Sequence, residues 1–185
     1  MKIKCLKNII LYIIILCQLI SFSCNKPGEQ VQKKKPGRRE LEKVNTYLAE
    51  KDRERILNYI ERKNLKMTES SSGLWYCIIN EGEGDFFKEN DRIVMDYECT
   101  LLDGTKCYSS YETGPKTVIL GKSNIEAGLA EGLKMLKPGG EAIFIIPPFL
   151  GWGLLGDDRA IPPRAVIVYE VKILNKKTPN RVQGD

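Results

Sequence analysis

The sequence predicts an α+β domain in which several antiparallel strands pack against one short helix, with a helical arm preceding them. Two observations support this fold class. Runs rich in aromatic and β-branched residues recur between 74 and 174, separated by Gly, Pro and Asp-Gly turn signals. After residue 39, apolar residues take helical spacing in 40–63 and 125–135, so the expected helices are few.

Residues 1–23 have the pattern of an export signal. Three lysines lie in the first seven residues, and the apolar run from 9 to 20 is shorter than a membrane span. Residues 21–23 lead into Cys24 in an order that resembles a bacterial lipobox, so we expect Cys24 to be the lipidated first residue of the mature chain. The alternatives are an ordinary cleaved signal with an incidental cysteine and an uncleaved anchor.

Residues 24–39 are predicted to form a flexible basic tether. The stretch 24–40 holds six Lys or Arg against two Glu, in a chain whose formal net charge is +5. The basic character therefore belongs to the signal and the tether and not to the domain. Such a cluster suits anionic lipid headgroups. The alternatives are a solvated linker and a nucleic-acid contact, and an exported chain would rarely meet nucleic acid.

Residues 40–69 are predicted to form a helical arm. Apolar residues recur there at three- and four-residue steps or multiples of them: Leu41, Val44, Leu48, Ile56 and Ile60. Asp52 falls on the same stripe, and we expect it to mark a break between two shorter helices. The arm is interpreted either as a helix packed on the domain or as a spacer or dimerising segment. Interruptions in the stripe disfavour dimerisation.

Residues 70–176 are predicted to form the domain, and 177–185 a polar tail. The Asp103-Gly104 pair provides a hairpin turn, since both residues tolerate positive φ. The helix is expected at 125–135, with Asn124 as its N-cap and a Pro-Gly pair as its stop. The strands are expected at 74–79, 92–102, 105–111, 117–120, 141–146 and 165–174.

Several chemistries are excluded by composition. The chain has no His, which rules out Ser-His and Cys-His nucleophilic catalysis and His-based zinc sites. Cys77, Cys99 and Cys107 show no CxxC pairing, so they are interpreted as small buried hydrophobes, with one disulfide as the alternative. The 151–156 run fits GxGxxG but lies between Pro-Pro pairs, not between a strand and a helix. We therefore expect no nucleotide, metal or other cofactor.

An ordered set of short motifs lies between Tyr97 and Tyr169. The set comprises Tyr97-Glu98-Cys99-Thr100-Leu101-Leu102-Asp103-Gly104, Leu120-Gly121-Lys122, Gly128-Leu129-Ala130-Glu131-Gly132, Leu136-Lys137-Pro138-Gly139, Trp152-Gly153 and Ile161-Pro162-Pro163. In this order and spacing it resembles the FKBP-type peptidyl-prolyl isomerases, over roughly residues 74–174. The resemblance implies a curved antiparallel sheet wrapped around the short helix, and an isomerase activity on X–Pro bonds.

Such an activity needs no nucleophile. The barrier of about 18–20 kcal/mol around an X–Pro bond comes from amide resonance. A dry apolar pocket favours the twisted amide, which has less charge separation than the planar one, and binding the twisted form more tightly is sufficient catalysis. The expected pocket therefore consists of aromatic and aliphatic residues with one or two hydrogen-bond donors.

The resemblance assigns site residues one by one. The expected catalytic residues are Tyr97, Trp152, Ile161 and Tyr169. The expected substrate-binding residues are Cys107, Tyr108, Ile125, Glu126 and Leu129. Ile161 matches the residue that covers the pocket, and the indole N–H of Trp152 replaces a tyrosine hydroxyl donor. Glu126 is expected to donate only its main-chain N–H to the ligand, with its side chain in solvent.

The chain departs from the family pattern at several of these positions. Cys107-Tyr108 replaces the family's Phe-Asp pair, so a pocket aromatic and a pocket carboxylate are expected to be missing. Leu129 stands in place of a tryptophan, and Lys116 in place of an aromatic residue. The departures predict weaker isomerisation than is typical of the family.

The resulting hypothesis is an isomerase or chaperone for X–Pro bonds of exported, proline-containing polypeptides. It would be anchored by lipid on Cys24 to a bacterial envelope membrane, facing the periplasm, with no nucleic-acid partner. The chain further resembles lipoprotein FKBPs of Bacteroidetes-type bacteria, including the gliding-motility-associated branch. The alternative is a non-catalytic FKBP-fold binding module in an envelope assembly. The sequence leaves open the clients, the membrane leaflet and the oligomeric state.

Overall fold

The computed structural model describes residues 37–174. The predicted export signal at 1–23, the lipidation site Cys24, nearly all of the 24–39 tether and the 177–185 tail lie outside the described residues. None of the helices within 37–174 combines the length and the apolar character that crossing a bilayer requires.

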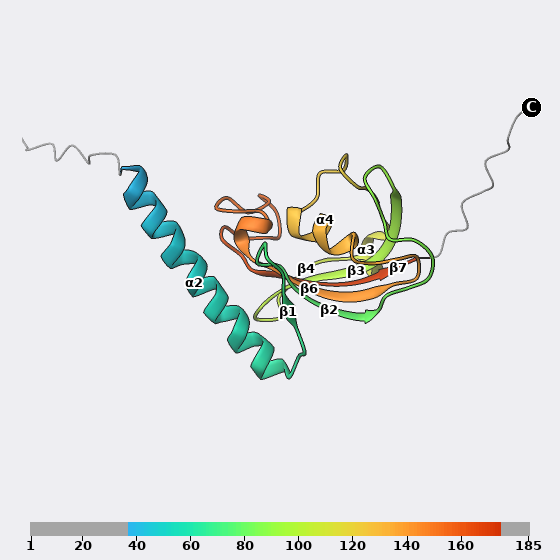
Figure 1. The fold of residues 1–185 in the computed structure, drawn as a ribbon, viewed down its shortest axis with the longest axis horizontal. Helices are drawn as coiled ribbons and strands as arrows, with labels where there is room; N and C mark the ends of the chain where they lie inside the picture. Colours follow the sequence, from blue (N-terminus) through green and yellow to red (C-terminus); the bar gives the residue numbers. More distant parts are fainter. Residues whose placement is uncertain (1–36, 175–185) are drawn as a thin grey trace, which may run out of the picture. The chain divides into compact units, whose positions relative to one another are not determined.

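Helix α2, Arg38–Lys63, is the arm (Figure 1). It runs unbroken through Asp52, so the predicted break at this residue is wrong. Asp52 is only 5% exposed, and its Oδ2 atom lies 2.6 Å from Nη2 of Arg164. Arg55, one turn further along the helix, is 3.5 Å from Oδ1. Because two cations satisfy the carboxylate, the helix can carry it on its buried stripe without interruption.

Seven strands form one antiparallel sheet, in the order β1-β2-β6-β7-β3-β4, with β5 paired to β3. The prediction of a mainly antiparallel α+β fold is confirmed. The strands run Thr68–Glu69 (β1), Trp75–Asn80 (β2), Arg92–Leu101 (β3), Lys106–Ser109 (β4), Lys116–Ile119 (β5), Glu141–Ile146 (β6) and Ile167–Ile173 (β7). The expected return strand at 105–111 is shorter, because Ser109 caps a single helical turn, α3, at Ser110–Thr113.

Both faces of the central strands are covered. Alternate residues of β6 and β7, such as Phe144 and Tyr169, belong to the main core against helix α4, Ala127–Leu133. Their neighbours Ile145 and Val168 belong to a second cluster with Trp75 and with Ile56 of α2. Because side chains alternate across a strand, α2 and α4 pack on opposite faces of the sheet. This explains why 141–146 reads as a nearly continuous apolar run.

Helix α4 lies unusually close to β6. A Cβ atom added to Gly128 would meet Ile146 at 2.7 Å, and one added to Gly132 would meet the Phe144 ring at 2.6 Å. The helix begins after Glu126, which has no side-chain capping bond, so the expected N-cap at Asn124 is wrong. A short 3₁₀ turn, η1, at Pro148–Leu150 follows β6 and leads into the glycine-rich loop.

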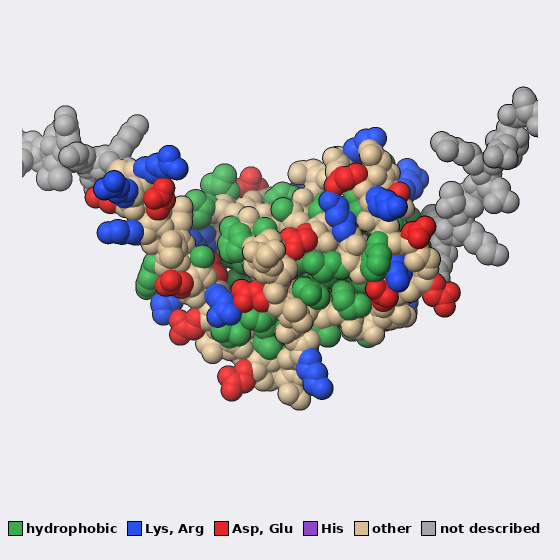
Figure 2. All heavy atoms as spheres, in the orientation of Figure 1, with side chains coloured by type: hydrophobic (Ala, Val, Ile, Leu, Met, Phe, Trp, Pro, Cys, Tyr) green, Lys and Arg blue, Asp and Glu red, His purple; other side chains and the backbone are tan. Residues whose placement is uncertain are grey.

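Charged side chains of both signs alternate over the surface. The face shown in Figure 2 carries Lys and Arg side chains interspersed with Asp and Glu, around patches of apolar side chains. This agrees with the prediction that the basic character belongs to the signal and the tether and not to the domain.

Candidate functional site

The predicted apolar site residues meet on one side of the sheet. Eight of them belong to the main core or pack against it, and we call this set the site cluster: Tyr97, Cys107, Tyr108, Ile125, Leu129, Trp152, Ile161 and Tyr169. They come from β3, β4, α4 and its approach, the loop after η1 and β7. The structure therefore brings together residues that are up to about seventy positions apart, as the resemblance implied; their roles stay predictions.

The register between β3 and β4 explains how the adjacent residues Cys107 and Tyr108 both reach the site cluster. Cys99 of β3 faces Tyr108 of β4 and Tyr169 of β7, and the β3–β4 register shifts between Cys99 and Thr100. At such a bulge two residues of one strand oppose one residue of the other. Cys107 is the extra residue, so both Cys107 and Tyr108 can contact the core that contains Cys99.

The members differ in how much surface they offer. Leu129, Ile161 and Tyr169 are buried, whereas Tyr97, Tyr108, Ile125 and Trp152 are half-buried. The rings of Tyr97 and Tyr169 lie 5.9 Å apart at a tilt of 31°. Contact with a ligand is therefore available mainly to the half-buried group, while Leu129 serves as core beneath it.

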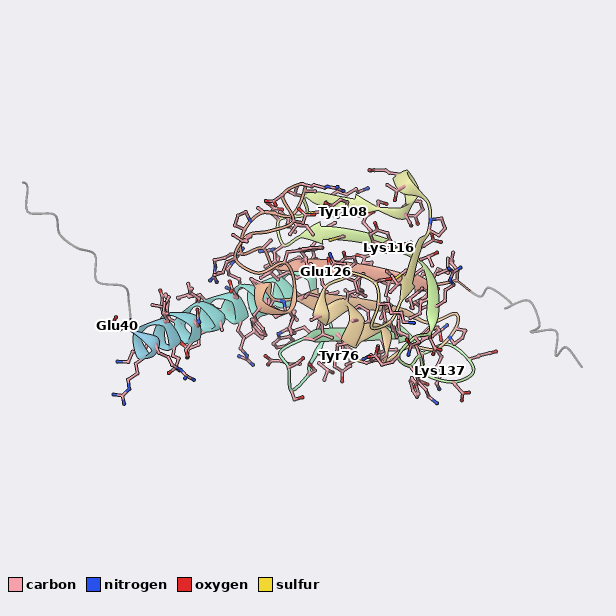
Figure 3. The ribbon with its side chains drawn as sticks, turned by 90° about the horizontal axis from the view of Figure 1, so that it is seen from above. Glu40, Tyr76, Tyr108, Lys116, Glu126 and Lys137 are labelled. Carbon is pink, nitrogen blue, oxygen red and sulfur yellow. The ribbon has the colours of Figure 1, made fainter. Side chains whose placement is uncertain are left out.

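The side chain of Glu126 contradicts its prediction. It does not point to solvent: the residue is 4% exposed and lies in the middle of the domain (Figure 3). Its Oε1 atom accepts a hydrogen bond from Nε1 of Trp152 at 2.7 Å and another from the hydroxyl of Tyr169 at 2.8 Å. The main chain turns at this residue, with φ −59° and ψ 138°, just before α4 begins.

This carboxylate changes the chemistry of the site. Trp152 gives its indole N–H to Glu126, so that donor is not free for a ligand carbonyl as expected. Burial, and then the negative charge of Glu126, raise the pKa of Tyr169, which keeps its hydroxyl protonated and donating. The second oxygen, Oε2, is buried and has no hydrogen-bond partner among the described residues.

The main-chain N–H of Glu126 is predicted to donate to a ligand carbonyl, and this role stays a prediction. Within residues 37–174, no acceptor for this N–H appears among the turn and cap hydrogen bonds, although its carbonyl accepts from Ala130. An unpaired main-chain donor beside an aromatic cluster can bind a ligand carbonyl. The residue therefore presents one free donor and one free acceptor.

Asp157, on the glycine-rich loop, is a site residue that the sequence analysis did not identify. It accepts a hydrogen bond from the hydroxyl of Tyr108, and also from the main-chain N–H groups of Ile161 at 2.8 Å and Arg159 at 3.0 Å. Burial works against its charge, but the hydrogen bonds prevail and lower the pKa of Asp157. Burial and the same bond raise the pKa of Tyr108 to about 12. A carboxylate thus approaches the site from the loop although β4 lacks one.

Lys116 and the cysteines complete the surroundings. The Nζ atom of Lys116 lies 5.4 Å from the centre of the Tyr97 ring, a cation–π distance. Cys77, Cys99 and Cys107 are free thiols, and only Cys99 is buried, so the expectation of three buried hydrophobes holds for one of them. Burial raises the pKa of the Cys99 thiol, which makes it an unreactive packing residue.

A groove lies away from this cluster. It encloses about 1040 Å³ between the C-terminal half of α2, the β3–β4 turn and residues 162–166. Arg55, Arg62 and Asp103 are among its lining residues, and polar groups dominate it. A polar groove does not suit a twisted amide that must leave water, so the aromatic cluster is the better candidate site. Within 37–174 no group of three or more Cys, Asp or Glu side chains is arranged to hold a metal ion.

Comparison with known proteins agrees with this geometry. Residues 84–174 match the family described as FKBP-type peptidyl-prolyl cis-trans isomerase. The isomerase FkpA of Escherichia coli K12 is 36% identical over 108 residues, which are 58% of this chain and 39% of that protein. The probable FkpA of Neisseria meningitidis serogroup B is 39% identical over 111 residues, which are 60% of this chain and 40% of that protein. The chain thus spans less than half the length of these relatives.

Solved structures show the same fold. The crystal structure of E. coli FkpA superimposes with a TM-score of 0.58 at 28% identity, covering 77% of this chain and 74% of that one. The crystal structure of AtFKBP13 gives a TM-score of 0.55 at 27% identity, covering 60% of this chain and 98% of that one. These matches agree with the antiparallel sheet and short helix described above. The chain therefore belongs to the FKBP-type peptidyl-prolyl cis-trans isomerase family, through the domain that contains residues 84–174.

Proposed function

We propose that this chain is a peptidyl-prolyl cis-trans isomerase that acts on X–Pro bonds of exported polypeptides while a lipid on Cys24 holds it at a bacterial envelope membrane. Family membership supports the reaction, and the lipobox-like sequence before Cys24 supports the anchor. The proposed side of the membrane is the periplasmic one. The further likeness to Bacteroidetes-type lipoproteins stays a prediction.

One observation carries the catalytic part. Tyr97, Ile125 and Trp152 are half-buried members of the site cluster, and the main-chain N–H of Glu126 has no acceptor among the turn and cap hydrogen bonds of residues 37–174. A proline ring can pack on the aromatic and aliphatic side chains, while the N–H donates to the carbonyl next to the rotating bond. Since the apolar surroundings disfavour the charge-separated planar amide, the twisted amide is bound more tightly than either planar isomer.

The test is an isomerisation assay of the full chain on a proline-containing tetrapeptide. We expect measurable activity that is weak for the family. Replacing Tyr97→Leu keeps an apolar side chain but removes the ring, and should lower kcat/KM by about tenfold, corresponding to about 1.4 kcal/mol of lost transition-state binding. The matched control is Tyr111→Leu, because Tyr111 is 89% exposed and should leave kcat/KM unchanged.

The second candidate function is a non-catalytic binding module, and the Trp152–Glu126 hydrogen bond favours it. That bond removes a side-chain donor that the site was expected to offer. If the unaltered chain binds proline peptides but does not accelerate their isomerisation, the binding module replaces the enzyme as the function.

The anchor is tested separately. Cys24→Ala should move the protein from the membrane fraction to the soluble fraction or leave it unprocessed. Metabolic labelling with a fatty acid should mark the unaltered protein and not the variant. Lipid labelling of the variant would remove Cys24 from the proposal while leaving the isomerase part intact.

A further inference from the structure

The carboxylate of Glu126 is buried without a positive charge beside it. Its two hydrogen-bond donors, Trp152 and Tyr169, are neutral, and its Oε2 atom has no donor among the described residues. None of the ion pairs found within residues 37–174 includes Glu126. Buried carboxylates are normally paired with a cation or fully hydrogen-bonded, because removing the charge from water is costly. Within residues 37–174, the Oε2 atom of Glu126 is therefore a buried acceptor that lacks a donor.

The other charged groups near the site do not fill this role. Lys116 lies over the ring of Tyr97 and is partly exposed, so solvent screens it. The carboxylate of Asp157 is already satisfied by Tyr108 and by main-chain N–H groups. Of these three charges, that of Glu126 is both the most buried and the least compensated.

A ligand can reach Glu126 from the side of Trp152. Of the two neutral donors, Tyr169 is fixed in β7 and buried, whereas Trp152 is half-buried and sits between Gly151 and Gly153 in the loop after η1. Gly153 has a φ of +64°, which favours glycine. An ammonium or guanidinium group that displaces the indole would replace a hydrogen bond from a neutral donor by an ion pair that also contains a hydrogen bond.

We propose that Glu126 is a specificity-determining residue that makes the site prefer proline-containing segments with a Lys or Arg side chain next to the proline. This inference rests on the proposed binding of X–Pro segments. The main-chain N–H of Glu126 holds the carbonyl of such a segment, and its side chain binds the neighbouring cation. Both contacts come from one residue, which fixes the cation close to the proline ring.

The experiment measures binding of four blocked tetrapeptides to the full chain by NMR titration. The peptides share the sequence Ala-Xaa-Pro-Phe, where Xaa is Lys, norleucine, Leu or Glu. Norleucine has a lysine-like stem without the charge. We expect the Lys peptide to bind about tenfold more tightly than the norleucine peptide, from a hydrogen bond to a charged group. The Leu peptide should bind like the norleucine peptide, and the Glu peptide more weakly than both.

The variant Glu126→Gln keeps an oxygen acceptor for Trp152 and Tyr169 but removes the charge. In this variant the Lys and norleucine peptides should bind within about twofold of each other. The matched control is Glu98→Gln, which removes a partly exposed carboxylate of β3 that pairs with Lys106 at 3.3 Å. This control should keep the preference for Lys.

The outcomes separate the two proposals. Equal binding of the Lys and norleucine peptides to the unaltered chain overturns the role of Glu126 and leaves the proposed function standing. Tighter binding of the Glu peptide also overturns it, and assigns selection to Lys116. Binding of none of the four peptides overturns the proposed function together with the inference. The comparison within the unaltered chain decides the matter even if Glu126→Gln fails to fold.

Discussion

Each face of the sheet buries one carboxylate, and the two carboxylates differ in the partners that surround them. Asp52, on α2, is 5% exposed and has Arg164 at 2.6 Å and Arg55 at 3.5 Å. Glu126, before α4, is 4% exposed; within residues 37–174 it has only neutral donors, and one of its oxygens has no partner. The first is an ion pair that joins the arm to the loop following Pro162-Pro163. The second is an unbalanced charge inside an aromatic cluster.

The difference separates a structural polar group from one that is available for binding. Complete pairing at Asp52 leaves nothing for a ligand to satisfy, and removing either partner would strand the other. Incomplete pairing at Glu126 lowers stability but retains affinity for a cation. Polar groups that are costly to bury and are left unsatisfied concentrate at functional sites. On this criterion the site lies on the α4 face and the arm is a support.

The largest effect is expected at the paired carboxylate. Asp52→Ala should lower the free energy of unfolding by about 1–3 kcal/mol, less than for a fully buried pair because the side chain of Arg164 is 31% exposed. Urea unfolding measures the loss. The control is Glu54→Ala, which breaks the exposed pair of Glu54 and Lys51 and should leave the free energy of unfolding nearly unchanged. Equal losses in the two variants would mean that the Asp52 pair contributes nothing special.

Removing the charge of Glu126 should affect the free energy of unfolding in the opposite direction. Glu126→Gln should leave stability unchanged or raise it by up to about 1 kcal/mol, since it removes a buried charge and keeps the acceptor for Tyr169. Glu126→Leu should instead lower stability by about 1–3 kcal/mol, because it strands the buried hydroxyl of Tyr169. Chemical denaturation of both variants separates two contributions to the free energy of unfolding. One is the cost of burying the Glu126 charge, and the other is the stabilisation from its hydrogen bonds. Destabilisation by Gln as large as by Leu would remove the contrast with Asp52.

The smallest effect concerns the loop carboxylate, Asp157. Because its pKa is lowered in the folded chain, its contribution to stability is complete above the ordinary carboxyl pKa of about 3.9 and is lost as pH falls through the lower folded value. Tyr108→Phe removes one of its donors and should cost about 0.5–1.5 kcal/mol at pH 7. Thermal unfolding of the unaltered chain and of Tyr108→Phe is measured between pH 7 and pH 2. The difference in stability between the two proteins should disappear in acid. A gap that is constant with pH would exclude Asp157 as the partner.

Most of the fold could be predicted because it depends on local pattern. The β6 strand falls at the expected 141–146, where an unbroken apolar run lies between turn signals. The Asp103-Gly104 turn and the ordered motifs were sufficient to predict that the residues of the site cluster lie on elements that pack together. The single turn α3 was missed because it depends on one capping contact, in which Ser109 accepts from the N–H of Tyr111.

The errors at Asp52, Glu126 and Asp157 share one physical cause, which is that their hydrogen-bond or ion-pair partners are distant in sequence. Asp52 resembled a helix break because its cation, Arg164, is 112 residues away. Glu126 was placed in solvent because its donors lie 26 and 43 residues further on. Asp157 was overlooked for the same reason, since Tyr108 precedes it by 49 residues. A lone Glu among Ile125, Ala127 and Gly128 was the available signal for a buried charge. Without its partners, however, the pattern could not distinguish burial from exposure.

The chain has two tryptophans, and each lies in one of the two compared regions. Trp75 packs with Ile56 of the arm beneath the guanidinium of Arg53, whose carbon lies 5.6 Å from the ring centre. Trp152 is bonded to Glu126 in the site. The protein thus contains its own pair of optical reporters. With Trp75→Phe, intrinsic fluorescence would follow the loop over the site alone; with Trp152→Phe, it would follow detachment of the arm alone. Ligand capture and arm movement could then be timed independently without any added dye.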